Sequence, residues 1–265
     1  MGRLDGKVAI VTGAGQGAGR GIALAMAKEG AAIVIAEINQ ATGGSTATEI
    51  AGLGLGGKAY AALCDVTRKA DIDNVVAETI SRFGAIDILV NNAQQFMMPT
   101  RLEETGEDVW ESCHTSGPLA HFRLMQGCFP HMKAKGGKII NLASGAALRG
   151  DKYLSAYAAA KGAVIALSKT AANEWAKYKI NVNVICPMVV SEAMKASIGT
   201  PHDFYTPLVT GCPLGRGGDA ETDIGRCAVF LASPDADYIT ACVLNVDGGA
   251  ADLSPLDLAK AGFLS

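Results

Sequence analysis

Short, continuously apolar segments alternate along the chain with longer amphipathic segments. The apolar segments predict strands that are buried on both faces of a sheet, at residues 8–12, 32–36, 58–63, 86–91, 138–143, 180–186 and 241–247. The segments between them predict helices at residues 17–29, 41–51, 68–83, 103–133, 152–178 and 220–232. This alternation predicts an α/β fold with a doubly wound, Rossmann-like parallel sheet of about seven strands.

The pattern contains no internal repeat and no linker, so we interpret residues 1–265 as a single domain. Residues 188–218 form a long stretch rich in glycine and proline, which predicts a lid over a substrate site. The last segment, residues 250–265, carries several leucines. Two interpretations of it stay open, packing across a subunit interface and a frayed terminus.

Composition narrows the class of protein. With 265 residues and 49% hydrophobic content, the chain can bury one sizeable core. Its net charge of −3 argues against nucleic acid or an anionic membrane as a partner. The four histidines do not cluster with cysteines or carboxylates at ligand spacing, so we expect no metal. Seven cysteines without a C-x-x-C pair predict reduced thiols in a cytoplasmic protein, and we expect neither a signal peptide nor a membrane span.

A glycine-rich turn over residues 13–20 joins the first predicted strand to the first predicted helix. Glycines there allow a tight turn and let the backbone approach a pyrophosphate at the positive end of the helix. Such a pattern alone is more often a flexible turn, but here the strand, turn and helix of a dinucleotide site follow one another. The predicted cofactor-binding residues of the turn are Gly13, Gln16, Gly17, Ala18 and Gly19.

Glu37 follows the second predicted strand, 24 residues after Gly13. A carboxylate at this place can accept hydrogen bonds from the adenosine ribose of a dinucleotide, and it repels a 2′-phosphate. An NADP site usually offers a basic residue nearby, whereas this chain has Gln16 and Ile38. The sequence therefore predicts NAD as the cofactor.

Tyr157 and Lys161 lie four residues apart in a predicted helix and so share one face. We expect the charge of Lys161 to favour the phenolate and to lower the pKa of Tyr157 from its usual value of about 10. Ser144, after the fifth predicted strand, can donate a hydrogen bond to a carbonyl oxygen nearby. Because a Tyr-x-x-x-Lys pair also arises by chance on solvated helices, its weight comes from its surroundings.

Taken in order, these motifs resemble the short-chain dehydrogenase/reductase family from Lys7 to Gly249. The resemblance rests on Thr12-Gly13, Cys64-Asp65-Val66, Asn91-Asn92-Ala93, Ser144, Tyr157 with Lys161, Pro187, and Asn245-Val246-Asp247-Gly248-Gly249. It implies a homotetramer and further cofactor-binding residues: Asp65 and Val66 at the adenine, Asn91 and Ala93 at the adenosine side, Lys161 at the nicotinamide ribose, and Pro187 and Val190 at the nicotinamide end. Asp65 also fits a helix N-cap before Thr67-Arg68, and the two roles are compatible.

Two adjacent residues of the long fourth helix depart from the family pattern. Gly117 stands where the family usually has an asparagine, which belongs to a proton relay that runs through a water to the catalytic lysine. Pro118 follows and cannot donate to the carbonyl of His114. We expect a kink there that leaves carbonyls free to hold a water in place of the missing side chain.

Three more residues at the nicotinamide end depart from the family pattern. Gln94 and Met188 stand where the family usually has glycine, and Glu192 stands where it usually has threonine. The predicted substrate residues are Gln94, Ser144, Met188, Glu192 and Phe204, with Phe96 and Met97 adding apolar surface. We expect them to surround a mostly apolar alicyclic or aromatic alcohol, with one hydrogen bond from Gln94, rather than a sugar. The alternative is that Gln94, Met188 and Glu192 turn outward and only pack the lid.

The sequence favours an NAD-dependent oxidoreductase that interconverts a secondary alcohol and its ketone. In oxidation, Tyr157 takes the hydroxyl proton, Lys161 stabilises the phenolate and Ser144 orients the oxygen, as hydride leaves for the nicotinamide. The physiological direction stays open. The competing hypothesis is a catalytically impaired NAD(H)-binding regulatory or scaffold protein of the same fold.

Overall fold

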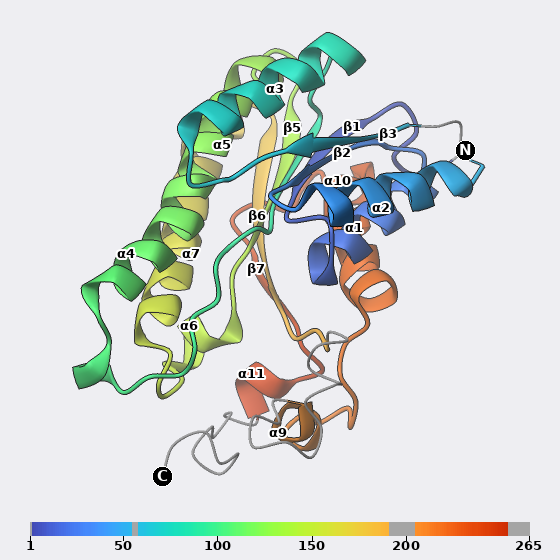
Figure 1. The fold of residues 1–265 in the computed structure, drawn as a ribbon. Helices are drawn as coiled ribbons and strands as arrows, with labels where there is room; N and C mark the ends of the chain where they lie inside the picture. Colours follow the sequence, from blue (N-terminus) through green and yellow to red (C-terminus); the bar gives the residue numbers. More distant parts are fainter. Residues whose placement is uncertain (1, 55–57, 191–204, 254–265) are drawn as a thin grey trace.

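The computed structural model of the protein describes residues 2–54, 58–190 and 205–253. Its seven strands form one parallel sheet in the order β3-β2-β1-β4-β5-β6-β7, which lies at the centre of Figure 1. The strands are β1 (Val8–Thr12), β2 (Ala32–Glu37), β3 (Ala59–Leu63), β4 (Ile88–Asn91), β5 (Gly137–Leu142), β6 (Ile180–Pro187) and β7 (Val243–Val246). The predicted α/β fold with a doubly wound parallel sheet is confirmed.

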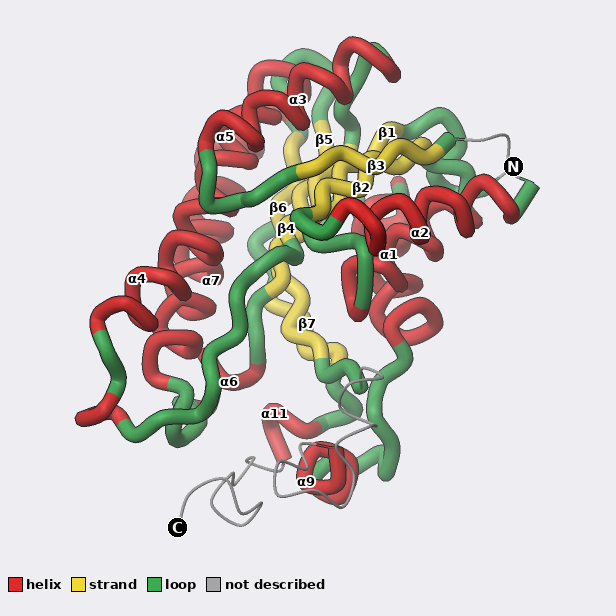
Figure 2. Tube along the Cα trace, in the orientation of Figure 1, coloured by secondary structure: helices red, strands yellow, loops and turns green. Residues whose placement is uncertain are grey.

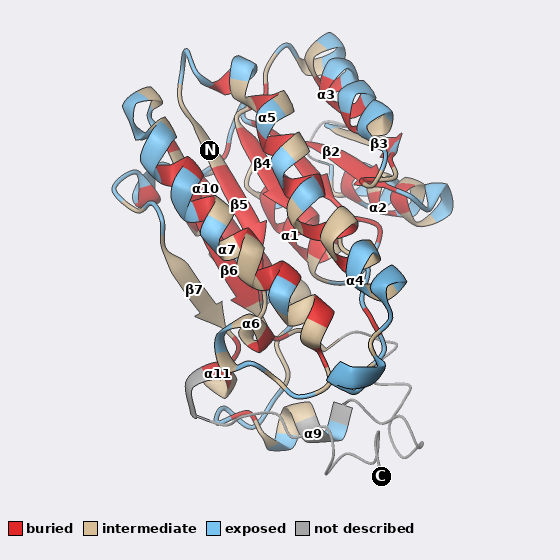
Figure 3. Ribbon diagram, turned by 90° about the vertical axis from the view of Figure 1, so that its left-hand side faces the viewer, coloured by how far each residue is buried: buried red, intermediate tan, exposed pale blue. Residues whose placement is uncertain are grey.

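Helices cover both faces of the sheet, as the tube in Figure 2 shows. On one face pack α1 (Gly17–Lys28), α2 (Gln40–Gly52) and α10 (Arg226–Ala232). On the other pack α3 (Lys69–Phe83), α5 (Ala120–Met132) and α7 (Ser155–Trp175). The remaining α-helices of the described residues are α4 (Glu107–His114), α6 (Gly145–Arg149), α9 (Tyr205–Thr210) and α11 (Ala250–Leu253). Figure 3 shows the buried central strands between helices whose outer faces are exposed. The edge strands β3 and β7 are only partly buried, so the predicted burial on both faces is wrong for these two.

The central strand β1 explains why its sequence is apolar throughout. All five of its residues are buried, with Ala9 and Val11 in the cluster under α1 and Ile10 in the opposite cluster. β1 pairs with β2 on one side, and with β4 on the other through Ala9 and Ile88. Because all the strands are parallel, their carboxyl ends meet at one edge of the sheet, where an open α/β sheet binds its ligand.

The predicted helix over residues 103–133 is broken into parts. Leu102–Glu104 form a short 3-10 turn (η1), and α4 begins only at Glu107. A wide turn, η2 (Thr115–Leu119), separates α4 from α5, and within it Gly117 has φ −95° and ψ −105°. The predicted kink at Gly117 and Pro118 is therefore confirmed, since proline cannot continue the hydrogen-bond ladder of a helix.

Other predicted boundaries shift by a few residues. Helix α7 begins at Ser155 and continues into a 3-10 turn, η3 (Ala176–Tyr178). A wide turn, η4 (Ala220–Gly225), precedes α10, and a 3-10 turn, η5 (Pro234–Ala236), follows it. Residues 191–204 of the predicted lid and 254–265 of the predicted tail lie outside the described residues.

Candidate active site

A hollow of about 500 Å³ lies at the carboxyl edge of the sheet, beyond β1, β2 and β4. Its walls come from separate segments of the chain that the sheet brings together. They include six of the predicted cofactor-binding residues: Gly13, Gln16, Glu37, Asp65, Val66 and Ala93. A glycine turn, a carboxylate and an apolar wall at one sheet edge fit the phosphates, ribose and base of a dinucleotide.

The turn after β1 has the geometry that its glycines allow. Gly13 and Gly17 have φ values of +62° and +54°, in the left-handed region that favours glycine. A Cβ atom on Gly19 would lie 2.3 Å from the carbonyl oxygen of Gly13, so the turn closes tightly against helix α1. The side chain of Gln16, the residue before α1, makes no capping bond to the helix. The first N–H groups of α1 are thus uncapped by that side chain, as an anion site at a helix start requires.

Glu37 is held in place by backbone groups before any ligand binds. Its carboxylate accepts hydrogen bonds from the N–H of Gly15 at 2.9 Å and from the N–H of Asn39 at 3.1 Å. The side chain is 8% exposed. A fixed acidic group of this kind favours ribose hydroxyls as partners and opposes a phosphate.

Two further predicted cofactor residues have structural bonds of their own. Asp65 accepts from the N–H of Thr67 at 2.9 Å and from its hydroxyl at 2.7 Å, which forms the turn that leads into α3. The N-cap interpretation of Asp65 is wrong, because the N-cap of α3 is Arg68, whereas Asp65 lines the hollow and forms the turn before it. The side chain of Asn91 is fully buried and donates to Asn141 at 2.8 Å, so it ties β4 to β5 instead of reaching the hollow.

Sequence reasoning missed a link that closes the floor of this hollow. The Thr12 hydroxyl accepts from the N–H groups of Asn92 and Ala93, at 2.9 and 3.0 Å. The amide of Asn92 donates to the carbonyls of Thr12 and Gly13, at 2.9 and 3.2 Å. The adjacent asparagines after β4 were a signal for this link, because an amide next to a strand end can bond the neighbouring backbone.

Ser144, Tyr157 and Lys161 come together beyond β5. The Ser144 hydroxyl accepts from the N–H of Ala146 at 3.2 Å at the start of α6, and it lowers the pKa of Tyr157 as a hydrogen-bonding neighbour. The Lys161 ammonium donates to the carbonyl of Leu142 at 2.6 Å and lies 5.7 Å from the centre of the Tyr157 ring. A phenol, an ammonium and a hydroxyl in this arrangement can exchange a proton with one oxygen atom.

The expected lowering of the Tyr157 pKa is wrong for this structure. Burial raises the pKa of Tyr157 to about 12, although the hydrogen bond to Ser144 acts in the opposite direction. Burial also lowers the pKa of Lys161 to about 7. The reason is that the packing around each group removes water from it, which disfavours its charged form.

The nicotinamide end is partly described. The Met188 N–H donates to the carbonyl of Val246 at 3.0 Å, and the Met188 residue is 7% exposed. The Val190 N–H donates to the carbonyl of Gly218 at 3.2 Å. These bonds tie the segment after β6 to β7 and to the turn before η4. The predicted substrate residues Glu192 and Phe204 lie outside the described residues.

Gln94 lines the cofactor hollow and also reaches the kinked turn. Its amide lies against Gly117 in the kinked turn, where a Cβ atom would come within 2.9 Å of the amide carbon. The amide nitrogen donates to the carbonyl of Cys113 at 3.4 Å. The structure thus brings together two departures from the family pattern that are 23 residues apart in the sequence.

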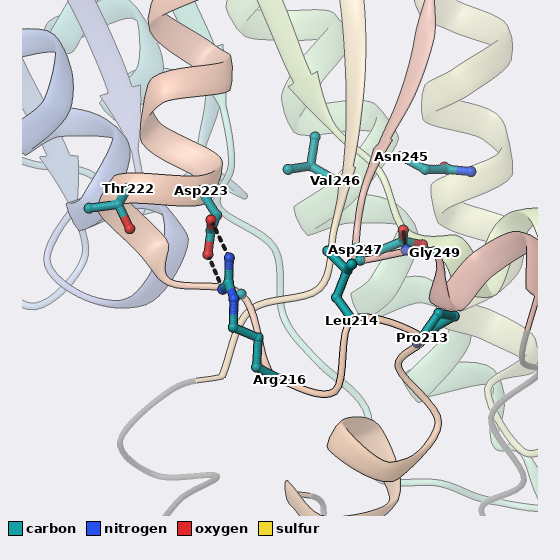
Figure 4. Close-up of a pocket in the computed structure, with 11 residues that line it drawn as sticks. Pro213, Leu214, Arg216, Thr222, Asp223, Asn245, Val246, Asp247 and Gly249 are labelled. Atoms are coloured by element: carbon teal, nitrogen blue, oxygen red, sulfur yellow. Dashed lines mark hydrogen bonds and ion pairs between the residues drawn. The ribbon is translucent and has the colours of Figure 1, made fainter.

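A second hollow, of about 640 Å³, lies at the end of β7. Figure 4 shows Arg216 and Asp223 on one side of it and Asp247 with Gly249 on the other. The guanidinium of Arg216 binds both carboxylate oxygens of Asp223, at 2.5 and 2.9 Å, and holds the pKa of Asp223 at about 2. With its charge paired in this way, Arg216 braces the turn between α9 and η4.

A family model described as enoyl-(acyl carrier protein) reductase matches residues 13–251. A 12α-hydroxysteroid dehydrogenase from a Clostridium species is 39% identical over 255 residues, which cover 94% of this chain and 98% of that protein. The chain belongs to the short-chain dehydrogenase/reductase family.

Two further relatives are a sorbitol dehydrogenase and a second hydroxysteroid dehydrogenase. A sorbitol dehydrogenase from Cereibacter sphaeroides is 42% identical over 260 residues, which cover 93% of this chain and 98% of that one. The solved structure of a 7α-hydroxysteroid dehydrogenase with NADH and 7-oxo glycochenodeoxycholic acid is 32% identical, with a TM-score of 0.87 and 97% of both chains covered. Within its described residues, this short-chain dehydrogenase/reductase has no candidate metal cluster and no helix that could cross a membrane.

Proposed function

We propose that this protein interconverts a secondary alcohol and its ketone with NAD as cofactor. The observation that carries the proposal is the meeting of Ser144, Tyr157 and Lys161 at the sheet edge that also holds the Glu37 hollow. The test is turnover of an alcohol panel with NAD⁺, followed by nicotinamide absorbance. Tight NADH binding without turnover on any alcohol would favour the impaired regulatory or scaffold protein, which no feature of the site supports.

Each of the three side chains has a separate task in this reaction. Ser144 orients the substrate oxygen by a hydrogen bond, and Tyr157 accepts the hydroxyl proton during oxidation or returns it during reduction. Lys161 lowers the cost of the phenolate by its charge and is itself held by Leu142. The bound NAD⁺ supplies a hydride acceptor. The backbone of residues 13–19 and the carboxylate of Glu37 would hold its phosphates and ribose.

We expect NAD⁺ to be preferred over NADP⁺ by at least about 2 kcal/mol in kcat/KM, or roughly 30-fold. The physical reason is repulsion between Glu37 and a 2′-phosphate that finds no cation at Ile38. Steady-state kinetics with both cofactors measure this preference. Glu37→Ala combined with Ile38→Arg should move it toward NADP⁺, whereas Glu78→Ala, on the distant helix α3, should leave it unchanged. Equal efficiency of the parent with both cofactors would refute the assignment of Glu37.

The substrate we propose is an apolar alicyclic or aromatic alcohol. Phe96 is 53% exposed, and its ring meets that of Tyr157 edge-on at 5.4 Å between centroids. Met98, in the same loop, is also exposed. An exposed aromatic ring beside the reacting phenol favours an apolar body on the substrate, since it would leave the hydroxyls of a polyol unpaired.

Phe96→Ala should lower kcat/KM for alicyclic alcohols by roughly tenfold, because one buried side-chain contact of this size is worth about 1–2 kcal/mol. Turnover of sorbitol, which lacks an apolar body, should change less. The measurement is the ranking of steroid, alicyclic, aromatic and sugar alcohols before and after the substitution. Tyr238→Ala removes an exposed aromatic residue at the opposite edge of the sheet and serves as the control. Sorbitol as the best parent substrate, with a ranking that Phe96→Ala does not alter, would contradict the proposal.

The assembly and location that we propose are a homotetramer in the cytoplasm. The residues Trp110, Leu119 and Phe122 are 45%, 38% and 44% exposed along the run from α4 to α5. Exposed apolar residues on one helical run are typical of a subunit interface. The seven cysteines are all free, which supports a reducing compartment.

A further inference from the structure

The kink between α4 and α5 brings a side chain from another part of the chain into its gap. A Cβ atom on Gly117 would lie 2.9 Å from both the amide carbon and the amide oxygen of Gln94, and 3.0 Å from its nitrogen. The Gln94 amide therefore occupies the space that a side chain at position 117 would take. The loop is fixed there, because the N–H of Gln95 donates to the Ser116 hydroxyl at 3.1 Å and Ser112 donates to the Gln95 amide at 2.7 Å.

Only one of the two polar atoms of the Gln94 amide has a hydrogen-bond partner among the described residues. Its nitrogen reaches the carbonyl of Cys113 at 3.4 Å, which is a long hydrogen bond. Its oxygen is buried and has no hydrogen-bond partner among the described residues. Buried polar atoms are almost always paired, with protein or with an ordered water, so this oxygen marks a place where a polar partner is required.

The turn of α7 that carries Tyr157 and Lys161 packs against the end of α4. Cys113, whose carbonyl holds Gln94, packs in one buried cluster with Tyr157 and Ala160 of α7. Groups from several elements feel the charge of Lys161 or act on it: Tyr157 on its own helix, Cys113 from α4, His121 from α5 and Cys186 from β6. His121 is 1% exposed, and neither of its ring nitrogens has a partner among the described residues. The Gln94 oxygen and the His121 ring are thus two polar groups without a partner among the described residues, and the Lys161 ammonium donates one of its three protons to Leu142.

We propose that Gln94 is a positioning residue for proton transfer, which holds a water between Lys161 and the kinked turn with His121 as a second acceptor. The proposal rests on the proposed alcohol dehydrogenase function. The amide reaches the kink from the loop after β4, where Gly117 has no side chain to offer. Gln94 then acts on turnover through this water, and it does not contact the substrate.

Proton balance shows what the water does. In each oxidation the alcohol loses a hydride from carbon, which NAD⁺ accepts, and a proton from oxygen, which Tyr157 accepts. That proton must leave the buried phenol before the next turnover. Lys161 passes one of its protons to the water and regains one from Tyr157, and the water releases its extra proton toward solvent along the opened turn. No group is oxidised or reduced beyond the alcohol and the NAD⁺.

Gln94→Ala should lower kcat for alcohol oxidation by roughly tenfold, while KM for NAD⁺ changes by less than about twofold. The loss of an acceptor beside Lys161 weakens its charged form, so the phenolate is less stabilised and the acidic limb of the kcat profile moves to higher pH. His121→Phe should also lower kcat and move the acidic limb of the kcat profile to higher pH. Gln126→Ala, the same change at an exposed position of α5, should keep the parent pH profile.

An exchange of the amide between the two positions separates positioning from mere packing. Gly117→Asn alone should slow the enzyme, because its Cβ meets the Gln94 amide. Gln94→Gly with Gly117→Asn should restore at least about half of the parent kcat and the parent limb, a strongly non-additive result. Failure of this double variant to recover, or parent-like kcat and limb in both Gln94→Ala and His121→Phe, would overturn the proposal. If Gln94→Ala does not fold, the double variant alone tests the proposal. The proposed function is tested separately, by alcohol turnover of the parent and its loss in Tyr157→Phe.

Discussion

Tyr157→Phe is expected to lower kcat for alcohol oxidation by roughly 10² or more, since general acid-base groups contribute about 10²–10⁴. The substitution removes one oxygen atom, which is the atom that exchanges the proton beside Ser144. Phenylalanine keeps the ring and its edge-on contact with Phe96. The affinity for NADH should therefore stay nearly unchanged.

Single-turnover kinetics and NADH fluorescence titration separate these two effects. Tyr178→Phe is the matched control, because it makes the same change in η3, near the opposite edge of the sheet, where the ring packs on Phe129. A Tyr157→Phe enzyme that kept more than half of the parent turnover, with chemistry as the slow step, would show that another group moves the proton.

Lys161→Met is expected to lower kcat by roughly 10² or more and to change how stability depends on pH. Burial holds the pKa of Lys161 at about 7, below its usual value of 10.5. Between these two pH values the unfolded chain binds a proton that the folded chain releases, so the stability of the parent rises with pH. Methionine has no such proton. Relative to the parent, Lys161→Met should therefore lose about 2 kcal/mol or more of unfolding free energy from pH 7 to pH 10.

Urea unfolding of the cofactor-free protein at a series of pH values measures this difference. Comparison within one pH series cancels the constant cost of leaving the Leu142 carbonyl without its donor. Lys177→Met removes an exposed lysine from η3 and should run parallel to the parent. Parallel curves for Lys161→Met as well would mean that Lys161 keeps an ordinary pKa in the folded protein.

Much of the fold could be predicted because its signals are local. A strand buried on both faces must be apolar at successive positions, and the five buried residues of β1 show this directly. A glycine turn before a helix and a carboxylate after the next strand are likewise short patterns with one physical meaning. The kink at Pro118 belongs to the same group, since the missing N–H of proline acts within one helical turn.

The parts that could not be predicted depend on residues distant in sequence. The direction of the Tyr157 pKa depends on how much water the fold removes from the phenol, and an i, i+4 spacing does not report this. The orientation of Gln94 depends on the empty space at Gly117. One signal was present: a glutamine where the family has glycine and a glycine where it has asparagine. Considered as a pair, these two changes remove an amide side chain from position 117 and place one at position 94, in the loop after β4.

Because of the strand order, the catalytic residues are positioned only after strands that are distant in the sequence have paired. Enzyme activity therefore reports complete folding. β1 is synthesised first but lies in the middle of the sheet, and the bond from the Val8 N–H to the carboxylate of Asp87, just before β4, spans 79 residues. Contacts of such long sequence separation form late and slowly, because the chain must first lose the entropy of a large loop. Ser144, Tyr157 and Lys161 are grouped by β5, which joins the sheet only through β4 on this side. A chain released before these strands have joined can hold helices and an apolar core, but its catalytic group has nothing to position it beside the glycine turn.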